Sequence, residues 1–380
     1  MQEMENLNVG VTGLGAMGSK HALDILNDEV PGLRLTAVAD AVPGRASEFA
    51  RDWDGLEAFE DTRAMIHSGK IGGLIIATPH FSHTELGILA LEAGLHVMVE
   101  KPVSVHKADC LALEAAYKKV GNRVFAAMFN MRTDPKFCKI KQLIDSGALG
   151  RINRVSWIVT DWFRTEAYYQ SGDWRATWAG EGGGVLLNQC PHQLDLWQWF
   201  FGMPGKVRAF CRFGQYHDIE VEDDVTAYLE YENGMTGTFI TTTGEAPGTN
   251  RLEIAAEQGR LLLENNRLQF IRNEVPTSIH SREKASKFKR PDTWVADIPF
   301  SENPRQHQDT LANFAQACLR GTPLVAPAVE GTHSVELGNA MLLSTWEDCT
   351  VDLPLDAEHF SALLQKHIES SRFQPSTSSP

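Results

Sequence analysis

The chain has 380 residues, of which 43% are hydrophobic and 22% are charged, and its formal net charge is -14. This length predicts two folded domains. The acidic balance argues against a nucleic-acid partner, because a phosphate-binding surface needs clustered lysine and arginine.

Neither a membrane partner nor a metal site is expected. No apolar run approaches the roughly 18 residues that span a bilayer, and the N-terminal MQEMENLNVG lacks the basic and apolar regions of a signal peptide. Six scattered cysteines without a C-x-x-C pair indicate reduced thiols. We therefore expect a cytoplasmic protein.

Residues 1–130 are predicted to form an α/β domain of the Rossmann type. Short apolar runs alternate with segments that carry apolar residues at helical spacing, which is typical of a parallel sheet with crossover helices. The predicted strands are 7–12, 33–39, 74–77, 96–99 and 124–129. The predicted helices are 19–26, 45–52, 82–93 and 105–120.

Residues 131–370 are predicted to form a second α/β domain with a large, open, mostly antiparallel sheet. After a helix at 136–145, strands are expected at 151–162, 207–215, 225–231, 235–243, 251–256, 260–264 and 267–272. Asn233-Gly234 is a strong hairpin signal. Helices at 306–320 and 332–346 are expected to cover one sheet face, and residues 371–380 to form a disordered tail.

The first strand leads into a glycine pattern that is typical of a dinucleotide-binding loop. Gly13, Gly15 and Gly18 form G-x-G-x-x-G at the start of a helix, whose first residues, Ala16 and Met17, would offer backbone N–H groups to a pyrophosphate. Asp40 follows Gly18 by 40 minus 18, or 22, residues, where a carboxylate meets the adenosine ribose. The pattern predicts NAD, with NADP less favoured, because a carboxylate accepts from the free 2'-OH and repels a 2'-phosphate. The nearby Arg45 makes that preference weaker. The alternative is an ordinary tight turn and helix cap.

Two later strands end in polar residues at the edge of the sheet where ligands bind. Thr78 and Pro79 follow one strand, and Glu100 and Lys101 follow the next. A desolvated lysine beside the nicotinamide would have a lowered pKa and could exchange a proton with a substrate hydroxyl. The alternative is a surface lysine that pairs with Glu100.

The segment GEGGGVLLNQCPHQLD contains three consecutive glycines, Gly182 to Gly184, which would cost backbone entropy in a helix or a strand. We expect them to let the chain pass close to the cofactor. Asn188 and His192 are four residues apart, so both would lie on one helical face if Asn188 caps the helix. Asp195 could orient His192; the alternative is a core histidine satisfied by Asp195.

An aromatic segment, 162–178, is a candidate for the substrate wall. Its aromatic side chains could stack on a sugar ring while arginines bind the ring oxygens, or they could be core and subunit contacts. Two further candidates, Asn130 and Arg132, follow the last Rossmann strand, and we expect His83 and Asn130 to contact the cofactor. The substrate-binding candidates are Lys101, Arg132, Trp162, Arg164, Trp174, Arg175, Asn188 and His192.

The motifs GLGAMG, ATPHFSH, EKP and GGGVLLNQCPHQLD, in this order, resemble the Gfo/Idh/MocA oxidoreductase family from about Asn6 to Leu355. The resemblance implies a nicotinamide cofactor between the two domains, and proton chemistry by Lys101 and His192 on a sugar-like substrate. It also implies oligomer contacts through the open sheet and a Lys101–Pro102 bond that is often cis. Asn188 stands where many members have aspartate, so a relay through a carboxylate there is lost.

The predicted function is NAD-dependent hydride transfer to or from a ring carbon of a sugar, glycoside or cyclic polyol. Lys101, His192 and Asn188 are the catalytic candidates, and a homodimer or homotetramer is expected. One alternative is an NAD-retaining glycosidase that works by transient oxidation and elimination. Another is a nicotinamide-sensing regulatory protein without catalysis.

Overall fold

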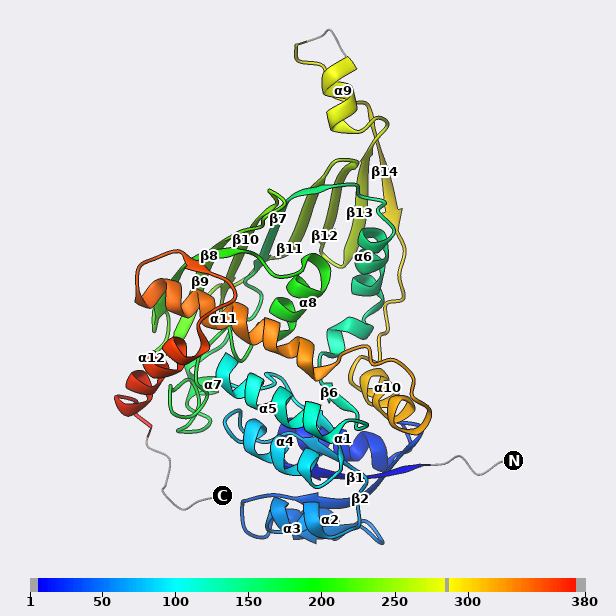
Figure 1. Cartoon of the computed structure of the whole chain (residues 1–380), viewed down its shortest axis with the longest axis vertical. Coiled ribbons are helices and arrows are strands. Elements are labelled where there is room, and N and C mark those ends of the chain that lie inside the picture. Colours follow the sequence, from blue (N-terminus) through cyan, green and yellow to red (C-terminus); the bar gives the residue numbers. More distant parts are fainter. Residues whose placement is uncertain (1–5, 284–286, 374–380) are drawn as a thin grey trace, which may run out of the picture.

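A parallel sheet of six strands forms the centre of the first domain (Figure 1). The structure, a computed structural model, describes residues 6–283 and 287–373. The strands are β1 (Leu7–Thr12), β2 (Leu33–Ala39), β3 (Glu57–Phe59), β4 (Gly73–Ile76), β5 (His96–Val99) and β6 (Phe125–Ala127). Their order, β3-β2-β1-β4-β5-β6, is that of a dinucleotide-binding fold, which confirms the predicted Rossmann domain.

Helices cover both faces of this sheet, so its strands are apolar on both sides. They are α1 (Ala16–Leu26), α2 (Arg45–Ala50), α3 (Thr62–His67), α4 (Ser82–Glu92) and α5 (Lys107–Val120). The prediction missed β3 and α3. A strand of three residues, Glu-Ala-Phe, is too short to show an alternating pattern.

The second domain is built on one sheet of nine strands. They are β7 (Ile152–Val159), β8 (Lys206–Phe213), β9 (Glu222–Glu230), β10 (Thr236–Thr242), β11 (Asn250–Ala256), β12 (Gly259–Glu264), β13 (Arg267–Asn273), β14 (Thr293–Ile298) and β15 (Val351–Asp352). Their order is β14-β13-β12-β11-β7-β10-β9-β8-β15. Only β7 and β10 pair in parallel among these described strands, and the hairpin predicted at Asn233-Gly234 joins β9 to β10. The mostly antiparallel sheet is confirmed.

Three helices pack on one face of this sheet (Figure 1). They are α6 (Pro135–Asp145), α8 (Pro191–Phe201) and α11 (Gly331–Trp346). In the core beneath them, Phe239 of the sheet packs against Trp157 of the sheet and Trp197 of α8. Phe210 and Tyr228 point the other way and are 58% and 41% exposed, so the opposite face carries exposed aromatic side chains.

Helix α10 (His307–Arg320) does not cover the large sheet as predicted. Leu311 and Phe314 pack instead in the core of the first domain, with Val9 and Val11 of β1. Its amphipathic pattern shows that one face is buried but not against which partner, so the sequence could not assign it. The remaining elements are α7 (Glu166–Tyr169), α9 (Thr277–Glu283), α12 (Ala357–Glu369) and two 3-10 turns, η1 (Asn130–Thr133) and η2 (Ala328–Glu330).

The predicted tail, 371–380, begins too early. The backbone N–H of Arg372 donates to Glu220 at 2.8 Å, so the chain is held as far as this residue. Residues 374–380 of that prediction lie outside the described residues. In the part of the chain that the structure describes, no helix is long and apolar enough to cross a membrane.

A buried ion pair between Lys107 and Glu336 joins the two domains. Lys107 begins α5, and its Nζ atom lies 2.7 Å from Glu336 of α11 and donates to the carbonyl of Leu355 at 2.8 Å. Asn339, one helical turn after Glu336, accepts from the backbone N–H of Lys107 at 3.0 Å. Because every polar group has a partner, this contact fixes how α5 sits against α11.

Candidate active site

The three glycines of the loop between β1 and α1 have different physical reasons. Gly13 has φ +84, and a Cβ on it would lie 2.6 Å from the carbonyl oxygen of Ala77. A Cβ on Gly18 would lie 1.8 Å from the carbonyl oxygen of Gly13. A Cβ on Gly15 would meet no atom of the described residues within 4 Å, so their packing does not explain this glycine.

Gly15 is the N-cap of α1, and no side chain of the described residues caps the helix there. The first backbone N–H groups of α1, including those of Ala16 and Met17, therefore face open space at the positive end of the helix dipole. Open space and uncapped N–H groups together fit the pyrophosphate of a dinucleotide.

Asp40 follows β2 and lies beside this loop. Its carboxylate accepts from the backbone N–H of Leu14 at 2.7 Å and of Val42 at 2.8 Å. Arg45 lies 3.2 Å from Asp40, but its own side chain is 46% exposed. The carboxylate is therefore fixed at the edge of the loop by the chain itself, with Arg45 on its solvent side.

A cavity of about 660 Å³ opens at the carboxyl ends of β1, β2 and β4, between the two domains. Residues of the Rossmann edge, including Thr12, Thr78 and Pro79, form one side of it. Trp174 and Gly180 of the second domain form part of the other side. The predicted strand-end residues Thr78 and Pro79 thus line one cavity together with Trp174, a substrate-binding candidate.

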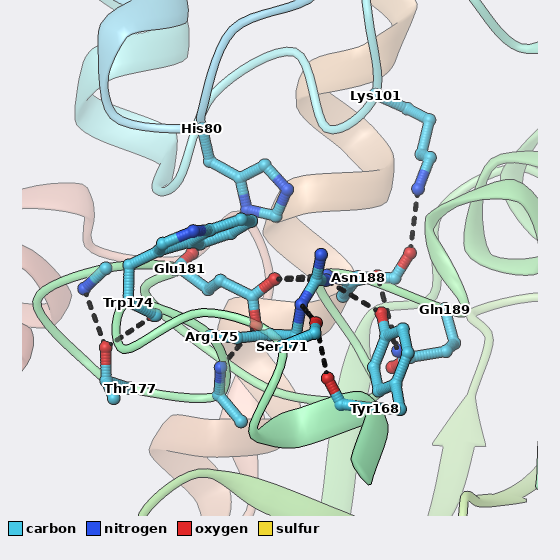
Figure 2. A network of polar contacts seen from close by, with 12 residues as sticks. His80, Lys101, Tyr168, Ser171, Trp174, Arg175, Thr177, Glu181, Asn188 and Gln189 are labelled. Atoms are coloured by element: carbon cyan, nitrogen blue, oxygen red, sulfur yellow. Dashed lines mark hydrogen bonds and ion pairs between the residues drawn. The ribbon is translucent and has the colours of Figure 1, made fainter. Parts of the chain in front are cut away.

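Lys101 leaves the end of β5 and reaches the second domain. Its Nζ atom donates to the backbone carbonyl of Asn188 at 2.8 Å (Figure 2). Burial lowers the pKa of Lys101, while the charges of Glu100 and Glu181 oppose that shift. The alternative of a surface lysine paired with Glu100 is not observed, and the Lys101–Pro102 bond is cis.

The side chain of Glu100 pairs with a buried histidine. Its carboxylate lies 2.7 Å from Nε2 of His21. Burial alone would raise the pKa of Glu100, but the hydrogen bond and charge of His21 outweigh it and lower this pKa to about 2. Glu100 also accepts from the backbone N–H of Lys101 at 3.1 Å, so it supports the lysine through the backbone.

His192 lies in the first turn of α8 with Pro191 before it, as predicted. Burial, and then the positive charge of Lys101, lower the pKa of His192 to about 3, so the imidazole is neutral. Its Nδ1 atom is buried and has no hydrogen-bond partner among the described residues.

Two predictions about this segment are wrong. Asn188 does not cap α8, because Cys190 is the N-cap and Asn188 lies in the preceding turn. Asp195 does not orient His192: its carboxylate binds Arg132 at 2.8 and 2.6 Å. A guanidinium offers two parallel N–H groups that fit a carboxylate better than one imidazole N–H does.

Arg132 is consequently not a substrate residue. Its side chain is 1% exposed and is bound by Asp195 and Glu330 as well as by the carbonyl of Val325. It therefore ties the end of the Rossmann domain to α8 and η2. The sequence placed Arg132 correctly after the last strand, but it could not show that the buried carboxylate of Asp195 binds its side chain.

The glycines of the GEGGG segment approach the protein itself. A Cβ on Gly182, which has φ +78, would lie 2.2 Å from Val105, and one on Gly184 would lie 1.9 Å from the carbonyl of Glu222. The carboxylate of Glu222 also accepts from the N–H groups of Gly184 at 2.9 Å and of Leu186 at 3.0 Å. The cofactor is therefore not the reason for these glycines.

Of the two histidines that follow β4, His80 rather than His83 lies among the polar groups of the site. His80 donates from Nδ1 to the carbonyl of Glu181 at 3.1 Å (Figure 2), and burial lowers its pKa to about 3. Both ring nitrogens of His83 lie 2.8 Å from carbonyl oxygens, those of Thr78 and Pro102. His83 thus binds the two strand-end loops and has no nitrogen left for a cofactor.

Guanidinium groups and aromatic rings alternate in the segment 162–175. Arg175 lies 4.6 Å from the ring centres of both Tyr168 and Trp174. Arg164 lies 5.0 Å from the ring of Tyr168 and 5.6 Å from that of Trp162. Nε1 of Trp162 and Nε of Arg164 are buried without a hydrogen-bond partner among the described residues, so two donors are unused.

Asn130 lies at the start of η1 and is buried. Its Nδ2 atom donates to the side chain of Gln306 at 3.0 Å and lies 3.3 Å from Nδ1 of His307. Its Oδ1 atom has no partner among the described residues. One buried acceptor therefore remains for a ligand amide or hydroxyl.

Two family models match the chain, one in each domain. Residues 7–128 match the oxidoreductase family with an NAD-binding Rossmann fold, and residues 137–262 match the GFO/IDH/MocA C-terminal domain. Scyllo-inositol 2-dehydrogenase (NAD(+)) of Bacillus subtilis is 26% identical over 87% of this chain and 91% of the relative. Levoglucosan dehydrogenase of Pseudarthrobacter phenanthrenivorans is 29% identical over 70% of this chain and 75% of the relative.

Among solved structures, the WlbA dehydrogenase of Bordetella pertussis in complex with NADH and UDP-GlcNAcA is similar, with a TM-score of 0.77 and 25% identity. The match covers 93% of this chain and 100% of that chain. Fold, loop and matches define an NAD-binding oxidoreductase. The chain belongs to the Gfo/Idh/MocA family, and the predicted family and cofactor are confirmed.

Proposed function

We propose that the protein transfers a hydride between NAD and a ring carbon of a sugar, glycoside or cyclic polyol. The inositol and levoglucosan dehydrogenases among its relatives support this substrate class. The observation that carries the proposal is the meeting of Lys101 with the 188–192 segment, because it brings a lysine of one domain to the turn that leads into His192 of the other.

Lys101 and His192 are the proton-transfer groups in this proposal. When the alcohol is oxidised, its carbon loses a hydride and its oxygen loses a proton, which these two side chains share. Burial lowers the pKa of Lys101, so its neutral form becomes accessible nearer to neutral pH. The neutral imidazole of His192 can accept a hydrogen bond from the same hydroxyl. Bound NAD supplies the hydride acceptor or donor.

Asn188 would hold the substrate without taking its proton. An amide donates and accepts hydrogen bonds but is not a base at neutral pH. The backbone carbonyl of Asn188 already binds Lys101, so a substrate hydroxyl that approaches the lysine meets the Asn188 side chain as well.

The cofactor would lie along the carboxyl edge of the Rossmann sheet. Gly13, Gly15 and Gly18 with the start of α1 would hold the pyrophosphate, and Asp40 the adenosine ribose. Asn130 would use its unpartnered Oδ1 atom. The 660 Å³ cavity beside Thr78 and Pro79 is large enough for part of the dinucleotide.

The aromatic segment would form the substrate wall. Trp162, Arg164 and Arg175 offer flat surfaces and N–H donors, which match the apolar face and the oxygens of a sugar ring. A second copy of the chain would cover the sheet face that carries Phe210 and Tyr228, because exposed aromatic side chains on an open sheet favour association.

A substrate panel tests the proposal. The purified protein is incubated with NAD and a set of inositols, sugars and glycosides, and NADH absorbance is recorded. NADH formation with a ring polyol supports a dehydrogenase. Free sugar released from a glycoside without NADH accumulation would contradict it in favour of the glycosidase, and nucleotide binding without turnover of any member would favour a regulatory protein.

A further inference from the structure

Glu181 is a buried carboxylate that no step of the proposed reaction uses. Its side chain is 2% exposed and lies between Asn188 and Arg175 (Figure 2). The turn that buries it is tight: the N–H of Glu181 donates to the carbonyl of Thr177 at 2.9 Å, and a Cβ on Gly180 would lie 2.0 Å from the carbonyl of Trp174. Glycine on both sides of Glu181 therefore permits its burial.

Both oxygens of Glu181 accept hydrogen bonds. Oε2 accepts from the backbone N–H of Ala176 at 2.6 Å, and Oε1 accepts from Nδ2 of Asn188. A guanidinium nitrogen of Arg175 lies 3.7 Å from Oε1. Burial raises the pKa of Glu181, and these donors oppose it. A carboxyl group that accepts on both oxygens and faces a guanidinium matches the ionised form.

The bond from Asn188 to Glu181 decides which way the amide points. Because Nδ2 donates to Glu181, Oδ1 is the atom that remains as an acceptor. Its one hydrogen bond among the described residues comes from Nε2 of Gln189, at a long 3.3 Å. The amide therefore presents an oxygen, rather than an NH2 group, to a substrate hydroxyl.

The charge of Glu181 also acts on Lys101. Burial disfavours the charged lysine, Glu100, Glu181 and Cys190 favour it, and Arg164 disfavours it. Glu100 belongs to the first domain, and its carboxylate lies 2.7 Å from Nε2 of His21. The nearby rings of His80 and His192 are held neutral by burial. Glu181 is thus the carboxylate of the second domain whose charge acts on Lys101.

We propose that Glu181 is a positioning residue of this active site: it fixes the Asn188 amide with its oxygen toward the substrate, in the same residue whose backbone carbonyl binds the Nζ atom of Lys101. Lys101 and Asn188 then present one donor and one acceptor to a substrate that carries a hydroxyl. Only the identity of that hydroxyl rests on the proposed function; the effect on Lys101 does not.

The titration of Lys101 tests the proposal without any substrate. The full-length protein is labelled briefly with acetic anhydride over a range of pH, and the acetylated Lys101 peptide is quantified by mass spectrometry. Glu181→Gln removes a neighbouring negative charge, so the labelling midpoint should move down by about one pH unit. Glu222→Gln is the matched control, because Glu222 is a buried glutamate near the same glycines and its carboxylate accepts from the backbone N–H groups of Gly184 and Leu186. The Lys101 midpoint in this variant should stay at the wild-type value. Equal midpoints in all three proteins would overturn the proposal.

A charge exchange tests the amide. Asn188→Asp places two carboxylates in hydrogen-bond contact, so kcat/KM on a ring polyol should fall about tenfold or more. Adding Glu181→Gln restores one carboxylate and one amide and should recover most of that loss, with circular dichroism as the check on folding. Losses that multiply in the double variant would contradict the assigned role. A shifted Lys101 midpoint in a protein that turns over no polyol would leave Glu181 as assigned and reject the dehydrogenase.

Discussion

Lys101 and Asn188 lie 87 positions apart in the chain, and one 2.8 Å hydrogen bond joins the Nζ atom of the first to the backbone carbonyl of the second. Lys101 ends a strand of the Rossmann sheet, whereas Asn188 lies in the turn before α8. The site therefore forms where the two domains meet, so the contacts that join the domains also position Lys101 relative to Asn188.

In the glycine loop, Gly15 and Gly18 should differ in whether a substitution affects NAD binding alone or folding as well. Gly15 has an ordinary φ of -72, and its Cβ would enter open space. Gly15→Val should therefore leave the melting temperature nearly unchanged but weaken NAD binding by about tenfold or more, or about 1.4 kcal/mol, by isothermal titration calorimetry. Gly18→Ala is the contrast: its Cβ would collide with Gly13, so both melting temperature and affinity should fall. Unchanged NAD affinity in Gly15→Val would place the pyrophosphate elsewhere.

His192 should stay neutral over the whole range in which an ordinary histidine titrates. Its pKa is lowered from 6.5 to about 3 by burial and by Lys101. NMR of the histidine ring signals, assigned with His192→Gln, should show no change for His192 between about pH 5 and pH 8. Since the folded pKa lies below the unfolded one, His192 lowers stability as the pH falls from 6.5 toward 3. A midpoint near 6.5 for His192 would contradict its desolvation.

Glu222 should make the protein less stable as the pH rises from about 4.5 to about 7. Burial raises its pKa from 4.5 to about 7, so the folded state retains a proton that the unfolded state has lost. Its contribution to stability is complete below pH 4.5 and falls by up to about 3 kcal/mol as the pH rises through 7. Urea unfolding at several pH values should show this slope in the wild type and not in Glu222→Gln. The same slope in both proteins would assign it to other groups.

The pair of Arg132 and Asp195 should matter for stability. Both side chains are 1% exposed, so removing one leaves an unpaired buried charge. Arg132→Met should cost about 3–5 kcal/mol of unfolding free energy. Arg132→Met together with Asp195→Leu should cost less than the sum of the single changes, because no buried charge is left unpaired; Glu330, the other acidic partner of Arg132, is 40% exposed. Fully additive losses in denaturant unfolding would show that the pair is not coupled.

Much of the fold could be predicted because its signals are local. Apolar runs gave the strands β1, β2, β4 and β5 nearly to the residue, and Asn233-Gly234 gave the β9–β10 hairpin. The misassigned α10 shows the limit: Phe314 and Leu311 form an apolar stripe, but only the tertiary structure shows that this stripe packs in the core of the Rossmann domain.

The site was predictable where a residue follows a strand end or a glycine pattern, and less so where partners come from distant segments. Lys101 was found because it ends β5 at the ligand-binding edge of the sheet. The partner of Asp195 was assigned wrongly, since the nearby His192 is an obvious candidate by spacing while Arg132 is 63 positions away. His80 and Glu181 were not identified from the sequence, although His80 follows Thr78-Pro79 and Glu181 precedes three glycines. Neither sequence pattern shows that these two polar side chains are buried.

The central claim is that Lys101 and His192 act on one substrate hydroxyl. The most direct measurement is the rate of NADH formation with a ring polyol for the wild type, Lys101→Ala and His192→Ala, with NAD affinity measured in parallel and Lys118→Ala as an exposed lysine control. We expect each site variant to lose at least about a hundredfold in turnover while NAD affinity and the control remain near the wild-type values. Near-normal turnover in both site variants would contradict the account.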